Sequence, residues 1–224
     1  MSSPNHGFMR WFRGTATHQE SSVRKDAPAA RTSRRSIGLG EFMRTLKVGG
    51  SEKLCILDLG PTSPSNIAFL TEHGLRVFNE DILRACKDPA YLAKQGDGTE
   101  RFDLEKFLSE NLAYPENQFD AILCWDATDY LPEELVRPVV DRIYAMLKPH
   151  GTLLAFFHDK DAGPDTPYYR YHIVQSDTLE MEPKPSLRLQ RVFNNRHVEN
   201  LFANFASRKF FLGRDNFREV VIVR

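Results

Sequence analysis

The stretch CILDLGPTSPSNIAFL, residues 55–70, decides the expected fold. It begins with a continuous apolar run that ends in an acid and a glycine, which is typical of a strand buried on both faces of a parallel sheet. The overlapping SNIAFLTEHG, residues 65–74, has the apolar spacing of a helix, and Gly74 is placed to end it. A buried strand followed by a helix predicts the opening unit of an α/β domain.

Strand and helix patterns continue to alternate after residue 74. The strand patterns are LRVFNED (75–81), FDAILCW (119–125) and TLLAFFH (152–158). The helix patterns are DPAYLAKQ (88–95), DLEKFLSENL (103–112) and PEELVRPVVDRIYAML (132–147). This order predicts a Rossmann-like, doubly wound and mainly parallel sheet with helices on both faces.

The C-terminal third of the chain has a different pattern. YYRYHIV (168–174) and LRLQRVF (187–193) predict an added hairpin, and NRHVENLFANF (195–205) has helical spacing. SRKFFLG (207–213) and REVVIVR (218–224) lie on either side of a short turn, which predicts an antiparallel hairpin that closes the edge of the sheet.

The N-terminal segment lacks a persistent period. Residues 1–36 are rich in Ser, Thr, Ala and Arg and predict a disordered basic tail, with the folded domain at 37–224. FMRWFRG (8–14) is the exception; it is either a short helix that docks on another surface or part of the disordered start. GLGEFMRTLKVGG (38–50) predicts a short helix that ends at a glycine pair.

Charge and composition exclude several classes of protein. Residues 1–53 contain ten Lys and Arg but four Asp and Glu, whereas residues 54–224 contain twenty and twenty-six. An acidic body is a poor binder of nucleic acid, because phosphate contacts require a basic face. No apolar run approaches the roughly 18 residues of a membrane span, and no signal peptide is recognisable. The three separated cysteines form no zinc motif, which favours a reducing, cytoplasmic location without a metal.

The expected strand ends carry polar side chains that should meet in one crevice. Ligands of open α/β sheets bind beyond the carboxyl ends of the strands, at the topological switch point. The side chains placed there are Asp58, Glu80, Asp81, Asp126, His158 and Asp159. Asp81 follows Gly60 by 21 residues, close to the roughly 20 residues found where a carboxylate binds a ribose.

These segments resemble the class I S-adenosylmethionine-dependent methyltransferases of the type 11 or type 12 kind. The matching motifs, spread over residues 54–159, are LDLGPTSPSN for the first strand and turn, VFNEDI for the second strand, FDAILCWDATDYL for the fourth strand, and LKPHG for the Leu-Lys-Pro-Gly-Gly turn. The glycine loop is degenerate, because Thr62 and Pro64 stand where the family has further glycines. The resemblance implies a Rossmann-like fold, S-adenosylmethionine as cofactor and methyl transfer as activity.

The resemblance also implies a set of site residues. The cofactor-binding positions are Asp58, Gly60, Pro61, Glu80, Asp81, Ile82, Trp125 and Asp126. The ribose would be bound by Asp81, with Glu80 as the close alternative. His158 and Tyr130 are the candidate catalytic residues, because a histidine can take up a proton near neutral pH. A structural role for His158 is the competing interpretation.

Two questions stay open at the level of sequence. The PTSPSN turn either still forms, with Ser63, Ser65 or Asn66 as helix-capping residues, or the cofactor pocket is lost. Strand alternation places Tyr169 and Tyr171 on one face of the added hairpin, which is either a lid over the substrate or an ordinary hairpin. The expected partner is a small-molecule methyl acceptor, because no added domain is present to bind a polymer. The alternative is a non-catalytic cofactor-binding or interaction protein on the same scaffold.

Overall fold

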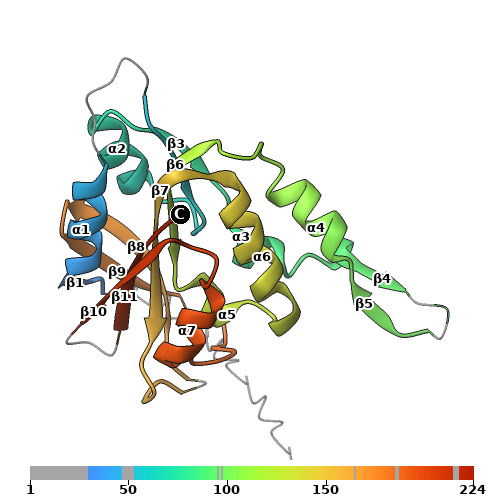
Figure 1. The fold of residues 1–224 in the computed structure, drawn as a ribbon. Coiled ribbons are helices and arrows are strands. Elements are labelled where there is room, and N and C mark those ends of the chain that lie inside the picture. The colour runs from blue at the N-terminus through green and yellow to red at the C-terminus, as the bar shows by residue number, and fades with distance from the viewer. Residues whose placement is uncertain are drawn as a thin grey trace, which may run out of the picture.

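The computed structural model describes residues 30–46, 53–94, 96, 98–163, 165–184, 187–213 and 217–224. Figure 1 shows a central sheet with helices on both of its faces and a smaller sheet beside it. The central sheet has the strand order β10-β11-β7-β6-β2-β3. Its strands are β2 (Cys55–Asp58), β3 (Arg76–Asn79), β6 (Phe119–Trp125), β7 (Leu147–His158), β10 (Ser207–Leu212) and β11 (Phe217–Val223).

Four neighbouring strands of this sheet are parallel, namely β7, β6, β2 and β3, whereas β11 and β10 run antiparallel at one edge. The predicted mainly parallel sheet with a C-terminal antiparallel hairpin is therefore confirmed. The LKPHG segment does not form a separate turn; it lies at the start of β7, where the pairing with β6 is irregular.

The helices cover both faces of the sheet. They are α1 (Ile37–Thr45), α2 (Pro64–Glu72), α3 (Ile82–Ala85), α4 (Leu104–Asn111), α5 (Ala127–Tyr130), α6 (Glu133–Met146) and α7 (Asn195–Leu201). Successive strand residues alternate between two cores. Ile56 and Phe156 pack with residues of α1, α2 and the smaller three-stranded sheet, whose strands are residues 32–35, 168–175 and 178–184. Leu57 and Phe157 pack with residues of α4, α6 and α7.

The predicted hairpin after the fifth strand pattern has a different second strand. β8 (Tyr168–Gln175) pairs with β9 (Thr178–Lys184), and residues 187–193 form neither helix nor strand. Leu179 and Met181 are the buried, alternating apolar residues of β9. LRLQRVF has a similar alternation, so the sequence offers two segments that could pair with β8. The nearer segment pairs, because a two-residue turn connects it directly to β8.

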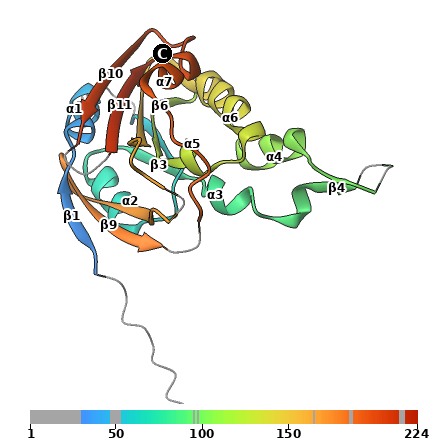
Figure 2. The same cartoon turned by 90° about the horizontal axis from the view of Figure 1, so that it is seen from below.

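Residues 88–95 also differ from their predicted helix. Pro89–Tyr91 forms a single 3-10 turn, and β4 (Leu92–Lys94) follows at once and pairs with β5 (Glu100–Phe102). This hairpin extends away from the rest of the domain in both views (Figure 1, Figure 2).

The boundary of the predicted tail requires a correction, because the folded domain includes residues 30–36. β1 (Thr32–Arg35) pairs antiparallel with β9. Arg34 forms a buried ion pair with Glu219 of β11, and Ser36 both caps α1 and donates to Glu219 over 3.0 Å. The sequence alone hides this arrangement, since the carboxylate that neutralises Arg34 lies 185 residues away. The FMRWFRG segment lies outside the described residues.

We expect Glu219→Gln to destabilise the protein strongly. The side chains of Arg34 and Glu219 are only 8% and 2% exposed. Removal of one charge from a buried pair leaves the other uncompensated, which costs about 3–5 kcal/mol. Urea unfolding should show a loss of that size. The control is Glu41→Gln, because Glu41 pairs with Lys209 at the surface and its loss should leave the urea midpoint nearly unchanged. Equal effects in the two variants would contradict an integral role for β1.

Candidate functional site

The carboxyl ends of β2, β3, β6 and β7 bring most of the predicted site residues to one edge of the sheet. Asp58 ends β2, Asp81 follows β3, Trp125 and Asp126 stand at the end of β6, and His158 ends β7. The parallel pairing of these strands sets their carboxyl ends side by side.

Asp58 is the buried centre of this edge. Its Oδ1 accepts hydrogen bonds from the backbone N–H of Gly60 at 3.0 Å and from Nε1–H of Trp125 at 2.6 Å. Its Oδ2 accepts from Nδ2–H of Asn66 at 3.0 Å. Burial raises the pKa of Asp58, and these three donors act in the opposite direction. Asp58 therefore connects the turn, α2 and the end of β6.

The PTSPSN turn forms without the additional glycines. Ser63 caps α2 by accepting from the N–H of Asn66, and Pro64 occupies the first turn of the helix, where its missing N–H carries no cost. Asn79 also supports the turn, because its amide donates to the carbonyls of Asp58 at 3.0 Å and Gly60 at 2.9 Å. The capping interpretation of this turn is thus the one that its geometry supports.

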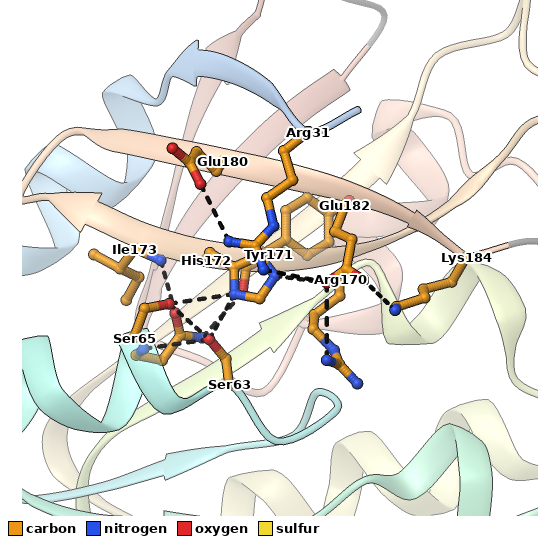
Figure 3. A network of polar contacts seen from close by, with 11 residues as sticks. Arg31, Ser63, Ser65, Arg170, Tyr171, His172, Ile173, Glu180, Glu182 and Lys184 are labelled. Atoms are coloured by element: carbon orange, nitrogen blue, oxygen red, sulfur yellow. Dashed lines mark hydrogen bonds and ion pairs between the residues drawn. The ribbon is translucent and has the colours of Figure 1, made fainter. Parts of the chain in front are cut away.

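The polar side chains of the turn contact the β8–β9 hairpin. Asn66 pairs with the backbone of β8 at two points, donating to the carbonyl of Tyr171 at 3.2 Å and accepting from the N–H of Ile173 at 2.7 Å. His172 places Nδ1 at 2.9 Å from Oγ of Ser63 and Nε2 at 3.0 Å from Oε2 of Glu182 (Figure 3). These contacts attach the hairpin to α2.

Two aromatic rings fill the crevice above the turn. Trp125 and Tyr171 are stacked, with ring centroids 5.1 Å apart and an angle of 13° between their planes. The Tyr171 hydroxyl donates to Oδ2 of Asp126 at 2.7 Å. Trp125 lies so close to Gly60 that a Cβ at that glycine would be 2.8 Å from the indole ring, so only glycine fits there.

The cavity enclosed between the turn, the end of β6 and β8 is very small. Its volume is ≈ 10 Å³, and its walls include four predicted residues, Gly60, Pro61, Trp125 and Asp126, together with Leu83, Tyr168 and Tyr171. Small-molecule sites commonly measure about 300–1,000 Å³. The crevice in this side-chain arrangement is therefore closed.

The two acids after β3 have different surroundings. Oε1 of Glu80 accepts from the hydroxyl of Tyr114 at 2.5 Å. Asp81 caps α3 by accepting from the N–H of Arg84 through Oδ1, and within the described residues its Oδ2 takes no hydrogen bond. Ile82 begins α3 and is fully buried. Within the described residues, each acid therefore has one oxygen that accepts no hydrogen bond.

His158 is held by Asp129, a contact that the sequence did not predict. Oδ2 of Asp129 lies 2.9 Å from Nδ1 of His158 and also accepts from the His158 backbone N–H at 2.8 Å. This contact favours the tautomer with its proton on Nδ1, which leaves Nε2 as an acceptor. The Tyr130 hydroxyl lies 3.5 Å from Nε2. Asp129 stands in the DATDYL segment after β6, and only the fold brings it to His158.

Metal ligation has no support at this edge. Among the described stretches, no group of three or more His, Cys, Asp or Glu side chains is placed to hold a metal ion. Within the same stretches, no helix is long and apolar enough to cross a membrane.

A family model described as a methyltransferase domain matches residues 30–205, which include all four strand ends and the added hairpin. The chain belongs to this methyltransferase family. The match begins at residue 30, in agreement with the inclusion of β1 in the folded domain. A search of curated proteins finds no match.

Solved structures similar to this methyltransferase domain share its fold at low sequence identity. A SAM-dependent methyltransferase from Archaeoglobus fulgidus has a TM-score of 0.50 and 10% identity, covering 83% of this chain and 91% of that one. The 1,6-didemethyltoxoflavin-N1-methyltransferase of Burkholderia thailandensis, solved with 1,6-didemethyltoxoflavin and S-adenosylhomocysteine, has a TM-score of 0.46 and 13% identity, covering 84% and 76%. An S-adenosylmethionine-dependent methyltransferase from Mesorhizobium loti has a TM-score of 0.45 and 12% identity, covering 82% and 96%.

The buried acid at the end of β6 gives the methyltransferase domain a pH-dependent stability. Burial raises the pKa of Asp126 to about 7, although His158 and the Tyr171 hydroxyl both favour its ionised form. The folded protein therefore binds a proton at Asp126 more tightly than the unfolded chain does. The stability that this proton provides is complete below the ordinary value of 3.8 and is lost as the pH rises through about 7.

We expect Asp126→Asn to remove this titration. The unfolding free energy of the wild type, relative to that of Asp126→Asn, should fall by roughly 2–4 kcal/mol from about pH 4.5 to about pH 8. Urea unfolding at the two pH values measures this difference. The control is Asp141→Asn, whose carboxylate is 55% exposed in the wild type and should give a difference that is nearly constant with pH. A constant difference for Asp126→Asn as well would contradict the raised pKa.

Proposed function

We propose that the protein is a SAM-dependent methyltransferase that acts on a small-molecule acceptor in the cytoplasm. The observation that carries this proposal is the family match over residues 30–205, which spans every strand end of the crevice. The methyltransferase from Burkholderia thailandensis was solved with a small-molecule ligand, and the acidic body of the present chain disfavours nucleic acid as the acceptor.

The proposed cofactor contacts follow from the positions of the side chains. Asp81 has an oxygen available for the ribose hydroxyls, since a carboxylate accepts from both. Asp58 and Gly60 shape the turn, and Pro61 and Trp125 line the crevice. Ile82, also predicted as a cofactor contact, is fully buried at the start of α3. Glu80 stays the close alternative, and Asp81 is preferred because of its spacing of 21 residues from Gly60.

The closed crevice does not fit S-adenosylmethionine. A volume of ≈ 10 Å³ cannot hold a nucleoside with an amino-acid side arm. Cofactor binding therefore requires Trp125, Tyr171 or both to leave their positions. The chemistry that the cofactor would supply is donation of a methyl group from a sulfonium centre.

Proton removal from an acceptor is the role proposed for His158. Asp129 keeps the imidazole in the orientation that presents Nε2 as a base. Tyr130 stands next to this nitrogen and its hydroxyl also donates to the carbonyl of Pro167 at 3.3 Å, so Tyr130 is proposed to position the base. His158 is 1% exposed and Tyr130 is 3% exposed, so an acceptor reaches them only from within the opened crevice.

A non-catalytic protein on the methyltransferase scaffold is the second candidate. The observation that favours it is the closed crevice, in which both oxygens of Asp58 already accept hydrogen bonds. The two candidates differ in whether the protein binds the cofactor and in whether any acceptor is methylated.

We expect Asp81→Asn to weaken the binding of S-adenosylhomocysteine by at least about tenfold, as measured by calorimetric titration. Hydrogen bonds to a charged group contribute about 1.5–3 kcal/mol, and asparagine caps a helix as well as aspartate does, so folding is preserved. Asp88→Asn is the matched control, since Asp88 also caps a short helical turn through its side chain but does not follow a strand of the central sheet. Unchanged affinity in Asp81→Asn would falsify the ribose assignment.

A further inference from the structure

We propose that Trp125 and Tyr171 form a gate that determines access of the cofactor to the crevice, and that the gate opens by rotation of the two side chains. This inference rests on the proposed cofactor binding. The gate is defined by the two stacked rings and by their two hydrogen bonds, one from Trp125 to Asp58 and one from Tyr171 to Asp126.

The gate is closed by specific polar contacts as well as by packing. Each ring carries one donor, and each donor reaches a buried carboxylate at a strand end: Asp58 is 2% exposed and Asp126 is 1% exposed. Hydrogen bonds to charged groups are among the strongest in proteins. Because burial raises the pKa of Asp126 to about 7, its bond from Tyr171 has this full strength only above that pH. The rings therefore stay in place because a buried carboxylate would lose a donor if either ring moved without a replacement.

The hairpin that carries Tyr171 is fixed at its backbone. Asn66 binds the β8 backbone on both sides of His172, through Tyr171 and Ile173. Figure 3 shows the adjoining network, in which His172 lies between Ser63 and Glu182, and Glu182 forms further ion pairs with Arg170 and Lys184.

Other contacts also oppose lifting of the hairpin. The first four residues of β9, Thr178–Met181, pair with β1, and β1 is held by the buried Arg34–Glu219 pair. Release of the hairpin as a unit would break its contacts with α2 together with either the β1–β9 pairing or the Arg34–Glu219 pair. Rotation of the Trp125 and Tyr171 side chains breaks their stacking, their two hydrogen bonds and their edge contacts with Phe156 and Phe217. It leaves the strand pairing intact, so the side chains are the moving parts.

The space that the gate occupies is the space that a ligand needs. Trp125 contacts Gly60, the one glycine of the turn, so closely that no Cβ could be accommodated. Removal of the indole from this position exposes the Gly60 backbone and one oxygen of Asp58. A ligand with a positively charged or hydrogen-bond-donating group at that point replaces the donor that Asp58 loses.

The energetic consequence is a lower apparent affinity in the wild type. A ligand that binds only the open state has its affinity reduced by the fraction of molecules that are open. Trp125→Phe retains an aromatic ring but has no N–H for Asp58, so it raises that fraction. Tyr171→Phe does the same at Asp126.

The test combines calorimetric titration with tryptophan fluorescence, using S-adenosylhomocysteine as the probe. The chain has two tryptophans, Trp11 and Trp125, so Trp11→Phe leaves Trp125 as the sole emitter. Trp125 is 3% exposed, and its emission should shift to longer wavelength when the probe binds and the indole leaves the core.

The affinity of Trp125→Phe for S-adenosylhomocysteine should exceed that of the wild type by about five- to tenfold, the expected effect of losing one charge-assisted hydrogen bond from the closed state. Tyr171→Phe is the second variant and should change the affinity in the same direction. Tyr144→Phe is the control, because Tyr144 packs against Phe205 and Arg224 and its affinity should equal that of the wild type.

The outcomes separate the gate from the proposed function. The gate is supported if Trp125→Phe and Tyr171→Phe bind S-adenosylhomocysteine more tightly than the wild type does, or bind it where the wild type does not. Wild-type binding without an emission shift, together with no gain in either variant, overturns the gate and leaves the cofactor assignment intact. Absence of binding in the wild type and in both variants at millimolar probe overturns the proposed function, and the gate with it.

Discussion

The buried carboxylate of Asp58 is the interaction on which the arrangement of the crevice depends. It accepts from the turn through Gly60, from α2 through Asn66 and from β6 through Trp125. A charge removed from water is tolerated only with such compensation, and each donor is itself constrained by the fold. Asn66 binds the β8 backbone, and Trp125 stacks on Tyr171. A displacement at any of these points therefore changes the hydrogen bonding of one shared carboxylate.

The departure from the family's glycine loop has a structural use in this chain. Further glycines would let a ligand approach the backbone closely. The residues present instead provide a cap at Ser63 and an amide at Asn66 that pairs with β8 as a neighbouring strand would. Pro64 fits the first helical turn without cost. In this chain the turn therefore attaches the β8–β9 hairpin to α2 instead of leaving its backbone open to a ligand. The parts of the crevice that can move are its side chains.

Local patterns were sufficient to predict the elements that bury apolar residues along a regular period. The runs ending at Asp58 and Trp125 are strands, and Asp81 lies just after β3, where it caps α3. Contacts between distant segments were beyond such patterns. The position of β1 depends on the ion pair between Arg34 and Glu219 of β11, which is far away in the sequence. Two later segments have the alternating pattern of a strand, and the sequence did not show which of them pairs with β8. The Asp129 contact to His158 likewise joins two strand ends that the sequence separates.

The direction of the Trp125 side chain is the feature of the site that no local pattern contained. Its φ of 50° lies in the left-handed region, where a bulky residue costs about 1–3 kcal/mol. The pairing of β6 with β7 shifts register between Leu123 and Trp125, and such irregularities redirect side chains next to functional sites. The strain persists because the Asp58 hydrogen bond and the Tyr171 stack compensate for it. The same two contacts that close the gate therefore also hold the backbone of Trp125 in this conformation.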